Sequence, residues 1–256
     1  MTEPGWTVLV PVEVLEGEGV PDAVIELLST LPVVVLGYHV LPEQTPPGQA
    51  RLQFEDQAQA KLDDLAAAFR EAGGDAESRL VFTHDEEQTL NRVAEETGCE
   101  AILIPNPATR IERVLVPLRG EVDVTRIAAF VAAMIGTRDI GVTLYHVTDS
   151  ADATAIGRSM LDEAADRLLE GGLAASAVTK DVVVSETPIQ SIATAATDHD
   201  AVVMGESAPS LRSFLFGEPA EQVAVHSLGP VVVVRRERSL NETGGAIDPA
   251  ERPSRD

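Results

Sequence analysis

The chain has 256 residues, 44% of them apolar, which suits two domains of ordinary size with a buried core in each. Its 42 acidic residues against 19 basic ones give a formal net charge of −23, which argues against nucleic acid or an anionic membrane surface as a partner. The carboxylates are spread along the chain and lysine is nearly absent. We therefore expect a protein adapted to high salt, where counterions screen the repulsion between its charges.

Cysteine content and the chain ends limit the function further. Cys99 is the single cysteine, so an internal disulfide and a thiolate metal cluster are excluded. Residues 1–14 lack a basic segment followed by an apolar one, and no apolar run is long enough to span a bilayer. A cytoplasmic protein without membrane insertion is expected. Residues 237–256 have no apolar periodicity, which predicts a disordered tail.

The first part of the chain alternates short Val, Leu and Ile runs with stretches of helical period. This pattern is typical of strand–helix units around a parallel sheet. The predicted strands are residues 6–13, 33–41, 76–83 and 101–105, and the predicted helices are residues 20–31, 51–72 and 86–97. Asp85, followed by Gln88, forms an N-cap signature for the last of these helices.

The second part repeats the scheme and extends it. Strands are predicted at residues 112–118, 140–148, 177–184, 201–205 and 230–235, and helices at residues 122–136, 154–171, 188–197 and 217–227. Thr187, followed by Pro188, is the N-cap signature here. The strand at residues 230–235 is strongly apolar, yet a terminal strand normally leaves one edge unpaired. We therefore predict a homodimer in which this strand pairs with its copy.

Direct repetition of sequence supports two tandem domains. Residues 8–13 (VLVPVE) recur as residues 114–119 (VLVPLR), and residues 38–40 (YHV) recur as residues 145–147. The predicted domains are residues 1–108 and 109–236. The first is shortened, because it runs from Pro105 almost directly into the next strand and has no room for a fourth helix and fifth strand.

The repeated residues resemble a known family. The VLVP run that opens the second unit, its YHV, the strand AVVMG at residues 201–205, and GEPAEQV at residues 217–223 leading to GPVVVV at residues 229–234 are similar to a universal stress protein domain. The resemblance covers all of the second unit and, more weakly, residues 6–105. It implies two doubly wound parallel-sheet domains of the adenine nucleotide alpha hydrolase-like class, and a role in stress response or regulation.

Family members that bind ATP carry a glycine loop, and this chain departs from that pattern. Gly205 matches the first glycine and Gly217 the last, but Ala208 stands in place of the middle glycine. Glu218 and Pro219 follow Gly217, so the helix start that should hold phosphate carries a negative charge and lacks one N–H donor. Phosphate would compete with the protein's own carboxylate. We therefore expect no cofactor, with ATP or AMP as the alternative.

The family's first strand ends in an aspartate that helps to hold the nucleoside. Glu13 occupies that place in the first unit and Arg119 in the second, and arginine cannot accept a hydrogen bond. Arg119 either supplies charge for phosphate or pairs with a carboxylate such as Asp123 or Glu206. The residual nucleotide site of the second unit would comprise Gly205, Ser207, Gly217 and Arg119.

The remaining polar residues give no catalytic constellation. His39 and His146 repeat but have no second ligand at metal-binding spacing, so both are interpreted as structural. No nucleophile elbow or phosphate-binding fingerprint is present. We predict a non-enzymatic stress-response or regulatory protein. The alternatives are an ATP- or AMP-binding module in the second unit and an accessory regulator of a membrane transporter, which would then be a partner.

Overall fold

The structure is a computed structural model that describes residues 5–119, 122–206 and 229–236. Its first half forms β1 (Val8–Glu13), α1 (Asp22–Leu28), β2 (Val33–Val40), α2 (Pro47–Glu71), β3 (Ala76–Thr83), α3 (Glu86–Glu96) and β4 (Ala101–Ile104). The second half forms β5 (Arg113–Pro117), α4 (Val124–Ile135), β6 (Gly141–Thr148), α5 (Thr154–Glu170), a 3-10 turn (Ala175–Ala177), β7 (Val178–Val184), α6 (Pro188–Ala196), β8 (Ala201–Gly205) and β9 (Val231–Val234).

The predicted strands and helices are present at nearly their predicted limits wherever the structure describes the chain. The helix predicted from residue 51 begins earlier, at Pro47, because proline is well placed in a first helical turn. Asp85 caps α3 by accepting a hydrogen bond from the Gln88 N–H at 2.9 Å, as predicted. Thr187 precedes α6 but makes no side-chain cap bond. The helix predicted at residues 217–227 and the tail at residues 237–256 lie outside the described residues.

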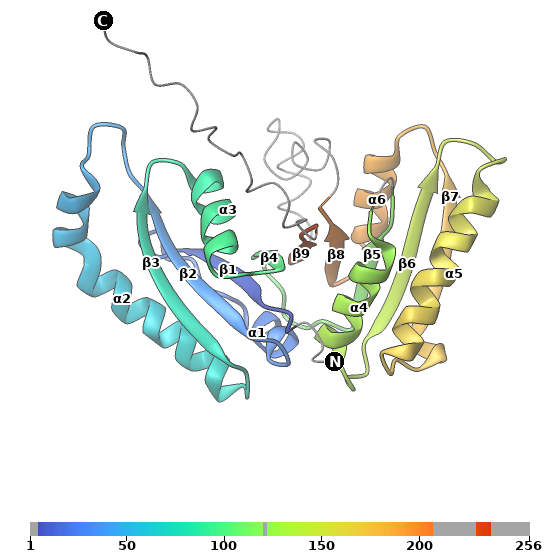
Figure 1. Cartoon of the computed structure of the whole chain (residues 1–256), viewed down its shortest axis with the longest axis horizontal. Helices are drawn as coiled ribbons and strands as arrows, with labels where there is room; N and C mark the ends of the chain where they lie inside the picture. Colours follow the sequence, from blue (N-terminus) through green and yellow to red (C-terminus); the bar gives the residue numbers. More distant parts are fainter. Residues whose placement is uncertain (1–4, 120–121, 207–228, 237–256) are drawn as a thin grey trace, which may run out of the picture.

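All of the strands that the structure describes join one mostly parallel α/β sheet. Its strand order is β3-β2-β1-β4-β9-β8-β5-β6-β7. Helices α1, α2, α4 and α5 bury their apolar residues in the cluster on one face, whereas α3 and α6 pack against the other face through two smaller clusters (Figure 1). Cys99 is a buried residue of the cluster that includes α3.

Strand β9 joins the two halves of this sheet. One edge pairs in parallel with β8, and the other pairs antiparallel with β4, placing Ile102 opposite Val233 and Leu103 opposite Val232. Both edges of this strand are therefore occupied within one chain. The prediction of a homodimer through residues 230–235 is wrong in this respect, because the edge partner that the apolar strand needs is β4 of the shortened first half.

Charged side chains fix the end of β9 between the two halves. The backbone N–H of Arg235 donates to the Glu100 carbonyl at 2.8 Å, and its guanidinium donates to the Cys99 carbonyl at 3.2 Å. Arg126 of α4 donates through Nε to the Arg235 carbonyl at 3.0 Å and pairs with the Glu100 carboxylate at 3.2 Å. Its guanidinium also lies 4.9 Å from the ring centre of Trp6. Arg235, which follows the apolar strand, and Arg126 of α4 thus fasten the end of β9 to the first half.

A second contact between the halves joins the ends of α1 and α4. Arg138 donates through Nε to the Ile135 carbonyl at 3.0 Å and through Nη2 to the Leu27 carbonyl at 2.8 Å, and it also bonds the Glu26 and Met134 carbonyls. Thr30 adds a bond from its hydroxyl to the Met134 carbonyl at 3.0 Å. The last carbonyls of a helix have no partner inside it and carry partial negative charge. One guanidinium therefore satisfies the ends of two helices from different halves.

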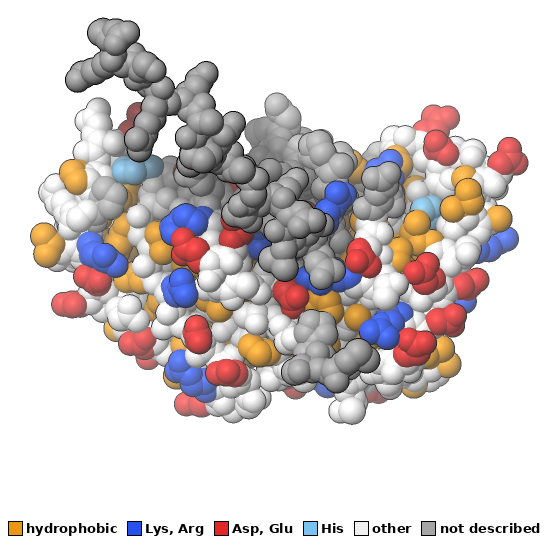
Figure 2. Space-filling model, in the orientation of Figure 1, with side chains coloured by type: hydrophobic (Ala, Val, Ile, Leu, Met, Phe, Trp, Pro, Cys, Tyr) orange, Lys and Arg blue, Asp and Glu red, His pale blue; other side chains and the backbone are white. Residues whose placement is uncertain are grey.

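The surface agrees with the dispersed charge of the sequence. Asp and Glu side chains are scattered over the face shown in Figure 2, with Lys and Arg between them. Most of the ion pairs involve exposed partners, such as Arg51 with Glu55 and Arg92 with Glu96. Exposed pairs of this kind contribute little stability individually. None of the described helices is both long and apolar enough to cross a bilayer.

Candidate functional site

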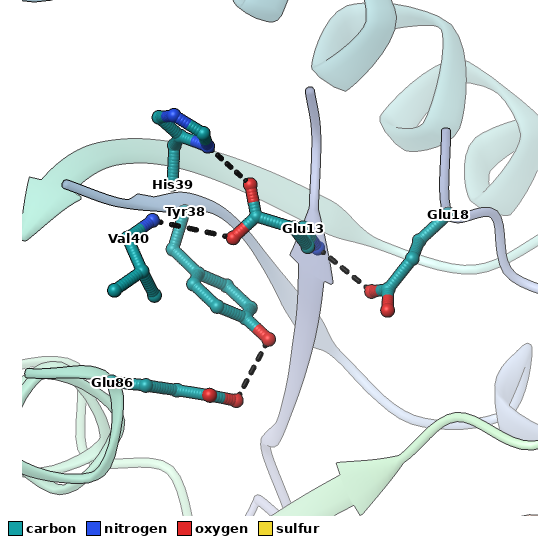
Figure 3. Close-up of polar contacts among 6 residues, drawn as sticks. All are labelled: Glu13, Glu18, Tyr38, His39, Val40 and Glu86. Carbon is teal, nitrogen blue, oxygen red and sulfur yellow. Dashed lines mark hydrogen bonds and ion pairs between the residues drawn. The ribbon is translucent and has the colours of Figure 1, made fainter. Parts of the chain in front are cut away.

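In the first half, a buried carboxylate ends the first strand. Glu13, 8% exposed, is the last residue of β1, and its Oε1 lies 2.7 Å from Nδ1 of His39 on β2 (Figure 3). Its Oε2 accepts a weaker hydrogen bond from the Val40 N–H at 3.3 Å, and its own N–H donates to Glu18 Oε2 at 2.9 Å. Both oxygens of this carboxylate are therefore bonded within the chain.

Neighbouring side chains extend this cluster toward α3. The hydroxyl of Tyr38 donates to Oε1 of Glu86, the first residue of α3, at 2.7 Å (Figure 3). Burial raises the pKa of the Tyr38 phenol, and the hydrogen bond and negative charge of Glu86 raise it further. The His39 ring meets Phe54 and Phe82 edge-on, with centroids 6.3 and 6.4 Å away. The polar groups at this edge of the first half thus have partners of their own.

The Glu13–His39 pair was missed by the sequence interpretation, which treated His39 as an isolated structural residue. The signal was present in the repeat. Strands β1 and β2 are parallel neighbours that pair Glu13 with Tyr38, so the next residue, His39, lies beside the end of β1. A carboxylate that ends one strand and a histidine near the end of the next are therefore brought together by the sheet.

Burial governs the charge of Glu13. Desolvation raises the pKa of this carboxyl above the ordinary glutamate value, and the hydrogen bond and charge of His39 only partly oppose the shift. A carboxyl with a raised pKa binds its proton more tightly in the folded chain than in the unfolded one. Its stabilising contribution is therefore complete below the unfolded pKa and is lost as pH rises through the folded pKa.

Replacement of Glu13 by glutamine should expose this dependence on pH. Relative to Glu13→Gln, the natural chain should lose free energy of unfolding as pH rises from the ordinary glutamate pKa through the raised one. Urea unfolding of both proteins at about pH 4 and about pH 7 measures the difference. Glu16→Gln, at an exposed position in the following loop, reports the effect of removing a nearby charge. A difference that grew in favour of the natural chain with rising pH would contradict the expectation.

The corresponding place in the second half is built differently. Arg119 follows β5 and is exposed, and the next two residues lie outside the described part of the chain. Of its suggested partners, Asp123 caps α4 by accepting from the Arg126 N–H at 2.8 Å. His146, the counterpart of His39, places Nδ1 2.7 Å from the Leu118 carbonyl and packs so closely on α5 that a Cβ at Gly157 would lie 2.4 Å from the ring. His146 is therefore structural, as predicted.

Of the predicted loop residues, the structure places Gly205, whereas Ser207 and Gly217 lie outside the described residues. Gly205 ends β8 and is buried, and an added Cβ would lie 2.6 Å from Ile127 Cδ1 on α4. A larger residue here would force the Ile127 side chain to move, so the packing of α4 favours glycine at this position. The N–H of the next residue, Glu206, donates to the Val234 carbonyl at 2.7 Å, and its carboxylate accepts from the Arg236 N–H at 3.1 Å. The start of the predicted loop is thus tied to β9.

Comparison with known proteins agrees with this arrangement of strands. The family model described as the universal stress protein family matches residues 110–235. Residues 110–235 belong to the universal stress protein family. No curated protein matches the chain.

Solved structures extend the likeness in fold. A universal stress protein from Archaeoglobus fulgidus is 17% identical, with a TM-score of 0.62, and the match covers 90% of this chain and 96% of that one. A second structure from that organism, solved with dAMP, is 19% identical over 48% of this chain and 96% of its own, with a TM-score of 0.37. A putative universal stress protein from Pseudomonas aeruginosa is 15% identical over 90% and 92% of the two chains, with a TM-score of 0.48.

Other polar residues of the universal stress protein domain have structural partners. Asp200 accepts hydrogen bonds from the Glu112 and Arg113 N–H groups at 2.9 and 2.8 Å, which fixes the start of β5. His199 lies with Nδ1 2.7 Å from the Ala195 carbonyl and Nε2 2.8 Å from the Thr143 hydroxyl. Among the described residues, no group of three or more His, Cys, Asp or Glu side chains could hold a metal ion.

Proposed function

We propose that the chain is a tandem universal stress protein that acts in stress response by binding and regulation and not by catalysis. Residues 1–108 would be a shortened scaffold domain and residues 109–236 the complete one. The observation that carries the proposal is the hydrogen bonding of the Glu13 carboxylate. This carboxylate takes the place of the nucleoside-holding aspartate, but its oxygens are bonded to His39 and Val40 of the same chain.

The second half supports the same proposal. Its first strand is followed by Arg119, whose guanidinium has no acceptor for a ribose hydroxyl. Gly205 is explained by its contact with Ile127, and the backbone N–H of Glu206 is already bonded to the Val234 carbonyl. An N–H that is bonded inside the sheet is not free to bind phosphate.

The second candidate function is binding of ATP or AMP at Arg119, Gly205, Ser207 and Gly217. It is favoured by the exposure of Arg119 at the carboxyl end of β5, which pairs with β8. Ligands of doubly wound sheets bind beside such strand ends. The Archaeoglobus fulgidus structure with dAMP shows a nucleotide bound to that protein.

Calorimetric titration separates the two functions. ATP, AMP and cyclic AMP would be titrated into the full chain in about molar KCl, where surface charges are screened. The proposal expects no saturable binding and no release of phosphate from ATP. Micromolar binding that falls at least tenfold in Arg119→Gln and is abolished in Gly217→Asp would replace it with the second candidate. Arg158→Gln, at an exposed arginine of α5, is the control for a lost positive charge.

A further inference from the structure

The equivalent tyrosines of the two repeats, Tyr38 and Tyr145, differ in their hydrogen bonding. Tyr38 of the first half donates its hydroxyl to Glu86, the residue that follows the N-cap of α3. Tyr145 occupies the same place in the second YHV, but the residue that follows the N-cap of α6 is Pro188, which has no acceptor side chain. Within the described part of the chain the Tyr145 hydroxyl has no hydrogen-bond partner, although the side chain is only 6% exposed.

This tyrosine lines a surface hollow of about 500 Å³ between α6 and strands β6 and β7. Asp181 also lines it and lies beside Tyr145 in the β6–β7 register. Burial raises the pKa of the Tyr145 phenol, and the negative charge of Asp181 raises it further, so the phenol is within electrostatic reach of that carboxylate. Because it has no partner within the described part of the chain, the Tyr145 hydroxyl is available to a ligand in this hollow.

The charges around the hollow select the kind of ligand. Of the residues that the structure describes, Asp181 and Asp198 line it and no lysine or arginine does. Its histidine, His199, is held by the Ala195 carbonyl and the Thr143 hydroxyl. Lys180, the neighbouring residue on β7, is paired with Asp162 of α5 at 2.5 Å, on the opposite face of the sheet from α6. The hollow therefore offers hydrogen-bond acceptors and negative charge without a compensating cation.

We propose that the hollow formed by Tyr145, Asp181 and Asp198 binds a small organic cation whose primary ammonium groups donate to the phenol oxygen and the carboxylates. The site lies on the α6 side of β6 and β7. Its volume falls within the range of small-molecule sites in proteins. Charge-assisted hydrogen bonds to two carboxylates set the preference for ammonium over a neutral hydroxyl.

The tyrosine content gives a direct readout. The chain has two tyrosines, so labelling tyrosine with ¹³C at Cζ should give two resonances in NMR of the full chain, one from Tyr38 and one from Tyr145. The probe is 1,4-diaminobutane, and 1,4-butanediol is the uncharged control of similar length. We expect the Tyr145 resonance to shift saturably with the diamine while the Tyr38 resonance stays fixed. The diol should move neither.

Variants test the individual groups by calorimetry with the same diamine. Tyr145→Phe and Asp181→Asn should each weaken binding by about tenfold or more, since each removes a partner of a charged group. Tyr38→Phe, whose hydroxyl is already bonded to Glu86, should bind as the natural chain does. The absence of saturable binding, equal binding of the diol, or affinity unchanged in both Tyr145→Phe and Asp181→Asn would overturn the proposal.

Discussion

Replacement of Arg138 by methionine should lower the free energy of unfolding by about 2 kcal/mol, because the carbonyls at the ends of two helices lose a charged donor. Methionine keeps much of the apolar stem and removes the guanidinium that bonds Leu27 of α1 and Ile135 of α4. Part of the loss is offset, because burial lowers the pKa of Arg138 and the buried charge carries a desolvation cost. Urea unfolding followed by circular dichroism measures the change.

An exposed arginine away from the contact between the halves serves as the control for Arg138. Arg158→Met removes an exposed arginine from α5, and it should change stability by less than about 0.5 kcal/mol. Hydrogen exchange should further show faster opening at the ends of both α1 and α4 in Arg138→Met. Equal stability of Arg138→Met and Arg158→Met would show that the hydrogen bonds from Arg138 to α1 and α4 do not hold the halves together.

Replacement of Val232 by aspartate should have the largest effect, a loss of about 4 kcal/mol or more. Val232 has 0% exposure and lies in β9 between Leu103 of β4 and Val203 of β8. An aspartate there buries a charge without a partner at the centre of the sheet. Because β9 contacts both neighbours, hydrogen exchange should show loss of protection in β4 and β8 together.

A matched substitution on an outer strand provides the comparison. Val184 ends β7, at the edge of the sheet, and is 51% exposed. Val184→Asp adds the same charge at an exposed position and should change stability by less than about 1 kcal/mol. Loss of protection in β8 alone in Val232→Asp, with β4 unchanged, would contradict the pairing of β9 with the first half.

The alternation of strands and helices could be predicted from sequence because it depends on local patterns. The apolar runs of β1 and β9 indicate strands, and Asp85 indicates a helix start, from neighbouring residues alone. The partner of β9 could not be predicted in the same way. Its apolar edge indicates that a partner exists, but either a second chain or β4 of the same chain satisfies the same hydrogen bonds. The choice depends on distant residues such as Arg126 and Glu100.

The candidate site shows the same division. The places of Glu13, Arg119 and Gly205 at strand ends follow from the repeat, and the structure puts them there. The hydrogen bond between Glu13 and His39 depends on the register of two parallel strands. Glycine at position 205 is favoured because Ile127 of helix α4 packs against it. These are tertiary contacts, so local sequence does not reveal them.

The two repeats have therefore diverged in how their polar groups are satisfied. In the first half, Glu13 and Tyr38 are bonded by His39 and Glu86 of the same chain. In the second half, Arg119 is exposed and Tyr145 has no partner within the described residues. At the junction, β4 and β9 run antiparallel, so their carboxyl ends lie at opposite edges of the shared sheet. The halves share one sheet, but these equivalent positions differ between them.

Disulfide trapping tests most directly whether β9 joins the two halves of one chain. Ile102 and Val233 are register partners in the antiparallel β4–β9 pair, where Cα atoms lie about 4.5–5.5 Å apart, within the range that a disulfide bridges. In a Cys99→Ala background, Ile102→Cys with Val233→Cys should oxidise to a monomer with an internal disulfide, seen by mass spectrometry of the peptides. Ile102→Cys with Val232→Cys should not, because adjacent strand residues face opposite sides of the sheet. Disulfide-linked dimers joined through position 233, with no internal bridge, would contradict the shared sheet.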